Sequence, residues 1–104
     1  MTDVAIIFCT CSTHDEALTI ANSLIEEQLA ACVNVLPQVE SIYRWQGKVE
    51  TAHEVLLIIK TTEEHFTAVR DRITQLHTYD TPEIVAMPVI HGSERYLAWL
   101  RGQV

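Results

Sequence analysis

The chain has 104 residues, 48% of them hydrophobic and 20% charged, which suits one folded domain over 1–104 and excludes a disordered chain. Its formal net charge of −7, from 14 Asp and Glu against 7 Lys and Arg, argues against nucleic-acid binding and against an anionic membrane surface, since both need a basic patch. A compact monomer of this mass is expected to expose roughly 5,900 Å².

The cysteines and the N-terminal residues indicate the compartment. Cysteine occurs three times, at Cys9, Cys11 and Cys32, and an odd number argues against a disulfide framework. Met1-Thr2-Asp3 lacks the basic region of a signal peptide. No run reaches the about 18 apolar residues needed to span a bilayer. The sequence therefore predicts a cytoplasmic protein.

The first predicted elements are a buried strand and an amphipathic helix. Residues 4–9 (VAIIFC) form a short apolar run rich in β-branched side chains, which is typical of a central strand. Thr13 precedes Glu16 by the capping-box spacing. Apolar residues then recur at helical intervals as far as Leu29, which predicts a helix over 13–30.

Two long extended segments follow, at 32–45 and 48–60. Proline is tolerated only on an edge strand or at a bulge, so Pro37 demotes the first segment to an edge. Gln46-Gly47 is a plausible hairpin turn between the two. Both segments exceed the mean strand length of about 5–6 residues, and a hairpin that outreaches its own sheet needs a further surface to pack against.

The last third of the chain predicts a helix, an edge strand and a short terminal helix. Thr61 and Glu64 repeat the capping-box spacing, and apolar residues follow at helical intervals as far as Leu76. Residues 83–90 resemble a strand that Pro88 demotes to an edge. Ser93 can cap a helix containing Tyr96, Leu97 and Leu100.

The element order is β-α-β-β-α-β with one additional short helix. This order predicts an α+β, ferredoxin-like fold, with a four-stranded antiparallel sheet, a long hairpin and two helices on one face. Right-handed crossovers place the first and third strands in the middle. The two proline-containing strands then lie at the edges, which agrees with the chemistry of proline.

This topology brings Cys9, Cys11, His77 and Glu83 to one end of the sheet, beside the start of the first helix. Sulfur, imidazole and carboxylate together suit a transition metal, and soft sulfur favours Cu or Zn over Mg or Ca. Each residue also has a purely structural interpretation: Cys9 as a small core residue, His77 as a cation at a helix C-terminus, and Glu83 as a charge at a strand start.

The remaining reactive residues predict no further site. Cys32 fits simple packing, and three histidines without obvious partners are expected to be solvated: His14, His65 and His91. Phosphate-loop, zinc-protease and serine-hydrolase motifs do not occur. His77 with Asp80 is a weak candidate for a general base with its orienting partner. We therefore expect no enzyme activity.

Several segments together resemble the CutA family of divalent-cation tolerance proteins: 29–34 (LAACVN) with Pro37, 41–48 (SIYRWQGK), 54–61 (EVLLIIKT), 77–84 (HTYDTPEI) and 96–100 (YLAWL). The resemblance covers nearly the whole chain. It implies a ferredoxin-like trimer, similar in architecture to PII signalling proteins, with a link to copper and other divalent cations. It also implies metal ligation by Cys9, His77 and Glu83.

The chain departs from the family pattern at two positions beside His77. Leu76 stands where some members have a second histidine, and Thr78 stands where the family usually has proline. Cys11 is the one evident substitute for the missing ligand. The expected cofactor is Cu(II) or another divalent cation.

Two other functions stay open. One is a PII-like regulatory module that binds a small anion or nucleotide between subunits, for which the sequence offers Arg44, Lys48 and Arg70. The other is a structural trimer without a ligand. All of these interpretations share a homotrimer, because the edge strand with Tyr43 and Trp45 would otherwise expose unpaired backbone and aromatic surface.

Overall fold

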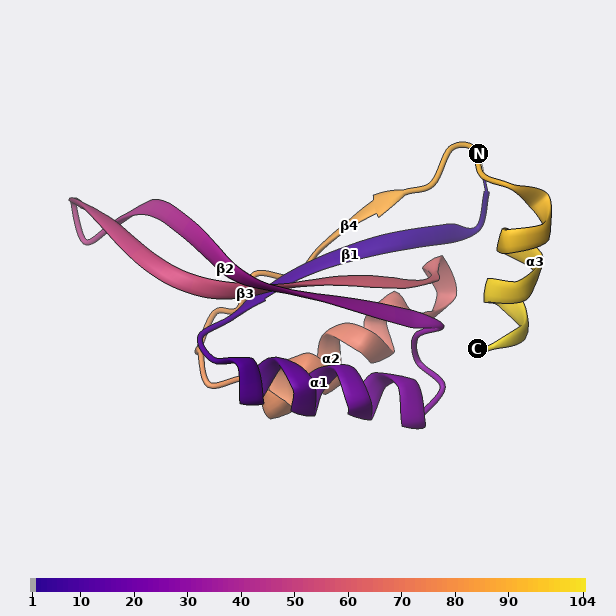
Figure 1. Cartoon of the computed structure of the whole chain (residues 1–104), viewed down its shortest axis with the longest axis horizontal. Coiled ribbons are helices and arrows are strands. Elements are labelled where there is room, and N and C mark those ends of the chain that lie inside the picture. The colour runs from indigo at the N-terminus through magenta and orange to yellow at the C-terminus, as the bar shows by residue number, and fades with distance from the viewer. Residues whose placement is uncertain (1) are drawn as a thin grey trace.

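The structure, a computed structural model, describes residues 2–104 (Figure 1) and has the predicted element order. Helices α1 and α2 cover one face of the sheet, and α3 lies across the sheet end that holds the N-terminus (Figure 1). This arrangement confirms the α+β, ferredoxin-like prediction. The elements are β1 Val4–Cys11, α1 His14–Glu26, β2 Cys32–Trp45, β3 Lys48–Thr62, the 3-10 turn η1 Glu63–His65, α2 Phe66–Leu76, β4 Val85–Pro88 and α3 Glu94–Gly102.

The four strands pair antiparallel in the order β2-β3-β1-β4, so β1 and β3 are central as predicted. Strand β1 pairs with β3 along its whole length, from Val4 opposite Thr62 to Cys11 opposite Val55. Both proline-containing strands are edges. Pro37 lies where the β2–β3 register shifts, between Leu36 and Val39, so the bulge accommodates its missing N–H.

The hydrophobic core lies between the sheet and the two helices. On β1, alternate residues face this layer, and Ile7, Cys9 and Cys11 are fully buried there. The residues between them, such as Phe8 and Thr10, face the helix-free side and are only half-buried. A second, smaller cluster joins α3 to the sheet through Val4, Leu97 and Leu100. No helix within 2–104 has the length and apolar character needed to cross a bilayer.

The outer half of the β2–β3 hairpin pairs only with itself and projects beyond the rest of the molecule (Figure 1). Its turn has positive φ at both Gln46 (50°) and Gly47 (79°), the left-handed pair that a type I′ turn requires. Side chains on both faces of this ribbon are exposed, including Ile42 and Trp45. The chain accordingly exposes 6548 Å², more than a compact monomer of its mass is expected to expose.

Helix α1 ends earlier than the predicted residue 30, at Glu26. Gln28 adopts a left-handed φ of 57°, and the N–H groups of Leu29 and Ala30 bond back to the carbonyl of Leu24. Leu29 still packs against the core after the helix has ended. The helical spacing of apolar residues therefore continues beyond the helix itself.

The prediction of a second capping box, at Thr61 and Glu64, is wrong. Thr61 is buried within β3 and its hydroxyl donates to the carbonyl of Leu29 at 2.6 Å, so it cannot cap a helix. The chain instead turns through η1 before α2 begins at Phe66. Strand β4 is also shorter than the predicted 83–90, because only Val85–Pro88 pairs with β1.

Candidate metal centre

Three soft or borderline donors lie close together on the helix-covered face of the sheet, at the end of β1. Cys9 and Cys11 are two residues apart on a strand and therefore share a face, as predicted, and His77 follows the last residue of α2. One ligand atom from each residue lies within 4.8 Å of the other two. All three side chains are fully buried. We call these three residues the Cys9–Cys11–His77 cluster.

The His77 ring is held in one orientation by backbone groups. Its Nε2 lies 2.8 Å from the carbonyl oxygen of Thr10, and its Nδ1 accepts the N–H of Tyr79 at 3.0 Å. This pattern corresponds to a neutral ring whose proton is on Nε2. The pairing of His77 with Asp80 considered from the sequence does not form, since Thr10 and Tyr79 use both nitrogens.

A carboxylate that the sequence did not mark as part of the site lies beside the ring. Glu16 Oε1 accepts the N–H of Ser12 at 3.0 Å, Oε2 accepts the N–H of Thr78 at 2.8 Å, and Oε2 is 3.8 Å from His77 Nδ1. Burial tends to raise the pKa of the Glu16 carboxyl, but hydrogen bonds from Thr78 and Ser12 outweigh it and leave the pKa lowered. Glu16 thus ties the start of α1 to the segment after α2.

Replacing Glu16 by glutamine should lower the free energy of unfolding by about 1–3 kcal/mol at pH 7, because two charge-assisted hydrogen bonds become neutral ones or are lost. A carboxyl whose folded pKa is lowered contributes stability above its unfolded pKa and loses it as pH falls through the folded pKa. The difference between wild type and Glu16→Gln in urea unfolding should therefore shrink towards zero below about pH 4. An equal difference at pH 3 and pH 7 would contradict this assignment.

The Cys9 thiol is a poor acid. A hydrogen bond with the Cys11 thiol and burial raise the pKa of Cys9, and the negative charges of Glu83 and Glu16 raise it further. Cys9 is therefore a thiol at neutral pH. A metal ion would have to displace its proton, so metal affinity must fall as the pH falls.

Glu83 is not a member of the cluster. Ile84 packs against the core, and the preceding Glu83 is exposed and lines a groove of about 500 Å³. This groove is also lined by Thr10, Tyr43, Trp45, Glu54, Tyr79, Asp80 and Thr81. The carboxylate is nevertheless close enough for its charge to raise the pKa of Cys9.

Tyr79 connects the groove with the cluster. Its hydroxyl donates to Glu54 at 2.9 Å, and its ring centroid is 4.8 Å from that of His77. Burial and the adjacent Glu54 carboxylate raise the pKa of Tyr79 to about 12, so the phenol stays protonated and remains a donor. No local pattern predicts this contact, because Glu54 and Tyr79 are 25 residues apart.

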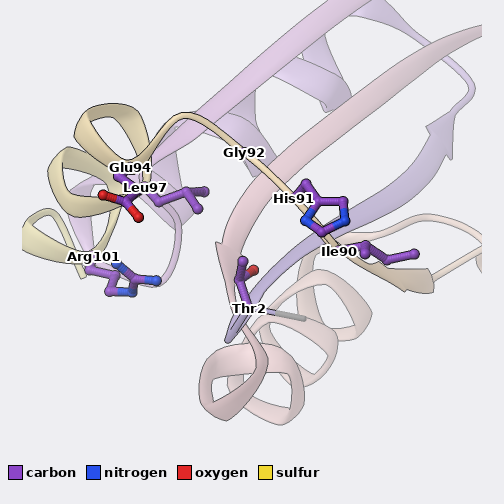
Figure 2. Close-up of a pocket in the computed structure, with 7 residues that line it drawn as sticks. All are labelled: Thr2, Ile90, His91, Gly92, Glu94, Leu97 and Arg101. Carbon is purple, nitrogen blue, oxygen red and sulfur yellow. The ribbon is translucent and has the colours of Figure 1, made fainter.

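A second depression, of about 440 Å³, lies at the α3 end of the molecule (Figure 2). Figure 2 shows Glu94, Leu97 and Arg101 on α3 facing Thr2 and His91 across it. Arg101 is already paired with Asp3 at 2.8 Å. None of the predicted metal ligands lies here, so this depression does not compete with the cluster as a metal centre.

The other residues singled out from the sequence lie apart from the cluster. Cys32 is half-buried at the start of β2. His65 was predicted to be solvated and without a partner, but its Nδ1 lies 2.6 Å from the Thr62 hydroxyl oxygen. Of the three cations suggested for anion binding, Arg44 and Lys48 are on the hairpin, whereas Arg70 is on α2 and pairs with Asp71 at 3.0 Å.

Comparison with known proteins agrees with this fold. Residues 5–103 match the family described as "CutA1 divalent ion tolerance protein". The chain is 48% identical over 96 residues to a divalent-cation tolerance protein CutA of Thermus thermophilus, covering 92% of this chain and 93% of that one. It spans only about half the length of a chloroplastic CutA from Arabidopsis thaliana (53%) and of the human protein CutA (55%).

Solved structures match the chain nearly end to end. The crystal structure of CutA from Xylella fastidiosa is 44% identical and has a TM-score of 0.95, with 98% of each chain covered. A CutA from Archaeoglobus fulgidus, described as a periplasmic divalent cation tolerance protein, is 40% identical with a TM-score of 0.93, covering 96% of this chain and 97% of that one. The chain therefore belongs to the CutA family of divalent-cation tolerance proteins.

Proposed function

We propose that this protein binds copper through Cys9 and His77, with Glu83 as an oxygen donor, and that it contributes to tolerance of copper and other divalent cations. The observation that carries the proposal is the buried cluster, in which thiol and imidazole donors lie within 4.8 Å of each other. Among divalent first-row cations, Cu(II) binds most tightly to mixed nitrogen, oxygen and sulfur ligands.

Occupying the site requires His77 to release a backbone hydrogen bond and Cys9 to release its proton. His77 must give up one of its two backbone hydrogen bonds to ligate an ion, which costs about 1 kcal/mol. Thiolate and imidazole sites for Zn(II) in folded peptides supply about 10–16 kcal/mol at pH 7. The exposed Glu83 side chain must also turn from the groove towards the ion, and its exposure leaves it free to do so.

Anaerobic titration with Cu(II) tests the ligand set. Cys9→Ser and His77→Ala should each weaken binding by at least about 100-fold, because even partners that only orient a ligand contribute 10–100-fold. Glu83→Gln should have a smaller effect, of about 10-fold. Cys32→Ser is the matched control, since it removes a thiol outside the cluster, and its affinity should equal wild type.

Two further measurements complete this test. Wild-type affinity should fall as pH is lowered, because binding displaces the Cys9 proton. Unchanged affinity in both Cys9→Ser and His77→Ala, with folded protein in each case, would mean that these residues only pack the core. Equilibrium dialysis against ATP separates the PII-like alternative, which predicts nucleotide binding that depends on Arg44 and Lys48.

We further propose that residues 1–104 act as one domain of a homotrimer. The helix-free face of the sheet carries exposed apolar side chains on β4, namely Val85 and Met87, and the projecting hairpin carries Ile42, Tyr43 and Trp45. An isolated two-stranded ribbon is marginally stable, so the outer hairpin needs a neighbour. Threefold closure would cover these surfaces without open-ended growth. Light scattering coupled to gel filtration should give about three times the 11.8 kDa chain mass.

We also propose that the protein acts in the cytoplasm and is not an enzyme. Three cysteines without disulfides fit a reducing compartment. The relatives are described by tolerance of divalent cations, with no reaction in their descriptions. A reproducible turnover lost in His77→Ala, with the oligomer intact, would overturn the second part of this proposal.

A further inference from the structure

We propose that Cys11 is a third protein ligand and that the Cys9–Cys11–His77 cluster forms a three-coordinate site, with two sulfurs and one nitrogen, for Cu(I). This inference rests on the proposed copper-binding function and assigns a different ligand set to the reduced ion. Cu(II) takes its oxygen donor from Glu83, whereas Cu(I) takes Cys11 instead.

The position of Cys11 supports its role as a ligand. It is the last residue of β1, opposite Val55, and its side chain is fully buried on the same face as Cys9. Within residues 2–104, these three residues are the single group of three or more Cys, His, Asp and Glu donors close enough to share an ion. No movement of Glu83 is needed to complete this set.

The donor chemistry favours Cu(I). Thiolates are soft ligands that select Cu(I), Zn(II) and iron–sulfur clusters, whereas carboxylates suit harder ions. Zn(II) takes four ligands and commonly completes its shell with water when the protein supplies three. The cluster supplies three donors, and all three side chains are fully buried, so none of them is in contact with bulk water that could provide a fourth ligand.

The net charge of the buried complex favours Zn(II) over Cu(I). Two thiolates and a neutral imidazole give a net charge of −1 with Cu(I) and of zero with Zn(II), and burial disfavours the charged complex. Coordination number and charge therefore make opposite predictions for the metal. A direct comparison of Cu(I) with Zn(II) is consequently part of the test.

The experiment is an anaerobic competition titration in which bicinchoninate holds Cu(I) and the protein competes for it. Cys11→Ser should weaken Cu(I) binding by at least about 100-fold and Cu(II) binding much less, because Cu(II) does not depend on Cys11. Cys32→Ser should match wild type for both ions. X-ray absorption of the Cu(I) protein should show two sulfur neighbours in wild type and one in Cys11→Ser.

Far-UV circular dichroism and thermal unfolding confirm that each variant is folded, and Cys11→Ala replaces Cys11→Ser if the buried hydroxyl disrupts the core. If Cu(I) binding depends on Cys9 and His77 but not on Cys11, this inference is overturned and the proposed function stands. If Cu(I) and Cu(II) binding are both unchanged in Cys9→Ser and His77→Ala, the proposed function fails as well. Tighter binding of Zn(II) than of Cu(I) overturns the assignment of the metal.

Discussion

Replacement of Ile7 by alanine is expected to lower the free energy of unfolding by about 2–5 kcal/mol. Ile7 is fully buried on the central strand β1, between Ile59 of β3 and Ala86 of β4, and faces the helix layer. Removing three carbon atoms there loses their transfer free energy and leaves a cavity that strands paired on both sides cannot close. The loss is a large share of the about 5–15 kcal/mol that stabilises a typical domain.

Urea unfolding at one fixed protein concentration measures this effect, because the stability of an oligomer depends on concentration. The midpoint should fall while the slope against denaturant stays the same. Val49→Ala is the control, since Val49 is 67% exposed near the hairpin tip and its change should stay within about 0.5 kcal/mol. Equal losses in the two variants would show that the core does not lie where the fold places it.

The strand order followed from the sequence because several local signals agreed. An uninterrupted apolar run in β1 predicted a central strand, and prolines in β2 and β4 predicted edges. The topology of the split β-α-β unit then left little freedom in the order. The hairpin turn was also predictable, because Gln46-Gly47 joins two extended segments and glycine readily adopts the left-handed conformation that the turn needs.

The boundaries were harder to predict, because burial and secondary structure are different properties. Leu29 continues the apolar spacing of α1 because it packs on the core, yet the helix has already ended at Glu26. Thr61 has the right residue type and spacing for a helix cap but is a paired strand residue in the structure. Tertiary packing determined both outcomes, and local patterns do not report it.

The candidate site was predicted in part, for a similar reason. Strand periodicity placed Cys9 and Cys11 on one face, and topology brought His77 beside them. The partners that orient the ring, the Thr10 carbonyl and the Tyr79 N–H, are backbone groups that any sequence would supply. The contact of Glu16 with Thr78 spans 62 residues, so only the folded chain reveals it.

Met87→Glu should convert the proposed trimer largely into smaller species. Met87 of β4 lies opposite Ile6 of β1, so its side chain is on the helix-free face of the sheet. Met87 is 44% exposed in the single chain. A carboxylate buried without a partner in each interface costs about 3 kcal/mol or more, which corresponds to a weakening of over about 100-fold. Symmetry repeats this cost in every copy, so dissociation should be evident at micromolar concentration.

Ile25→Glu is the matched control for this experiment, because Ile25 is 41% exposed but lies on α1, on the opposite side of the sheet. It introduces the same charge at a similar exposure, so the two variants differ in the face that receives the carboxylate. Light scattering coupled to gel filtration should find Ile25→Glu trimeric and Met87→Glu reduced in mass. A trimeric Met87→Glu would place the interface elsewhere, and a monomeric wild type would remove the trimer altogether. Retained Cu(I) affinity in a dissociated Met87→Glu would further show that the Cys9–Cys11–His77 cluster, whose three ligands come from one chain, needs no neighbouring subunit to bind its ion.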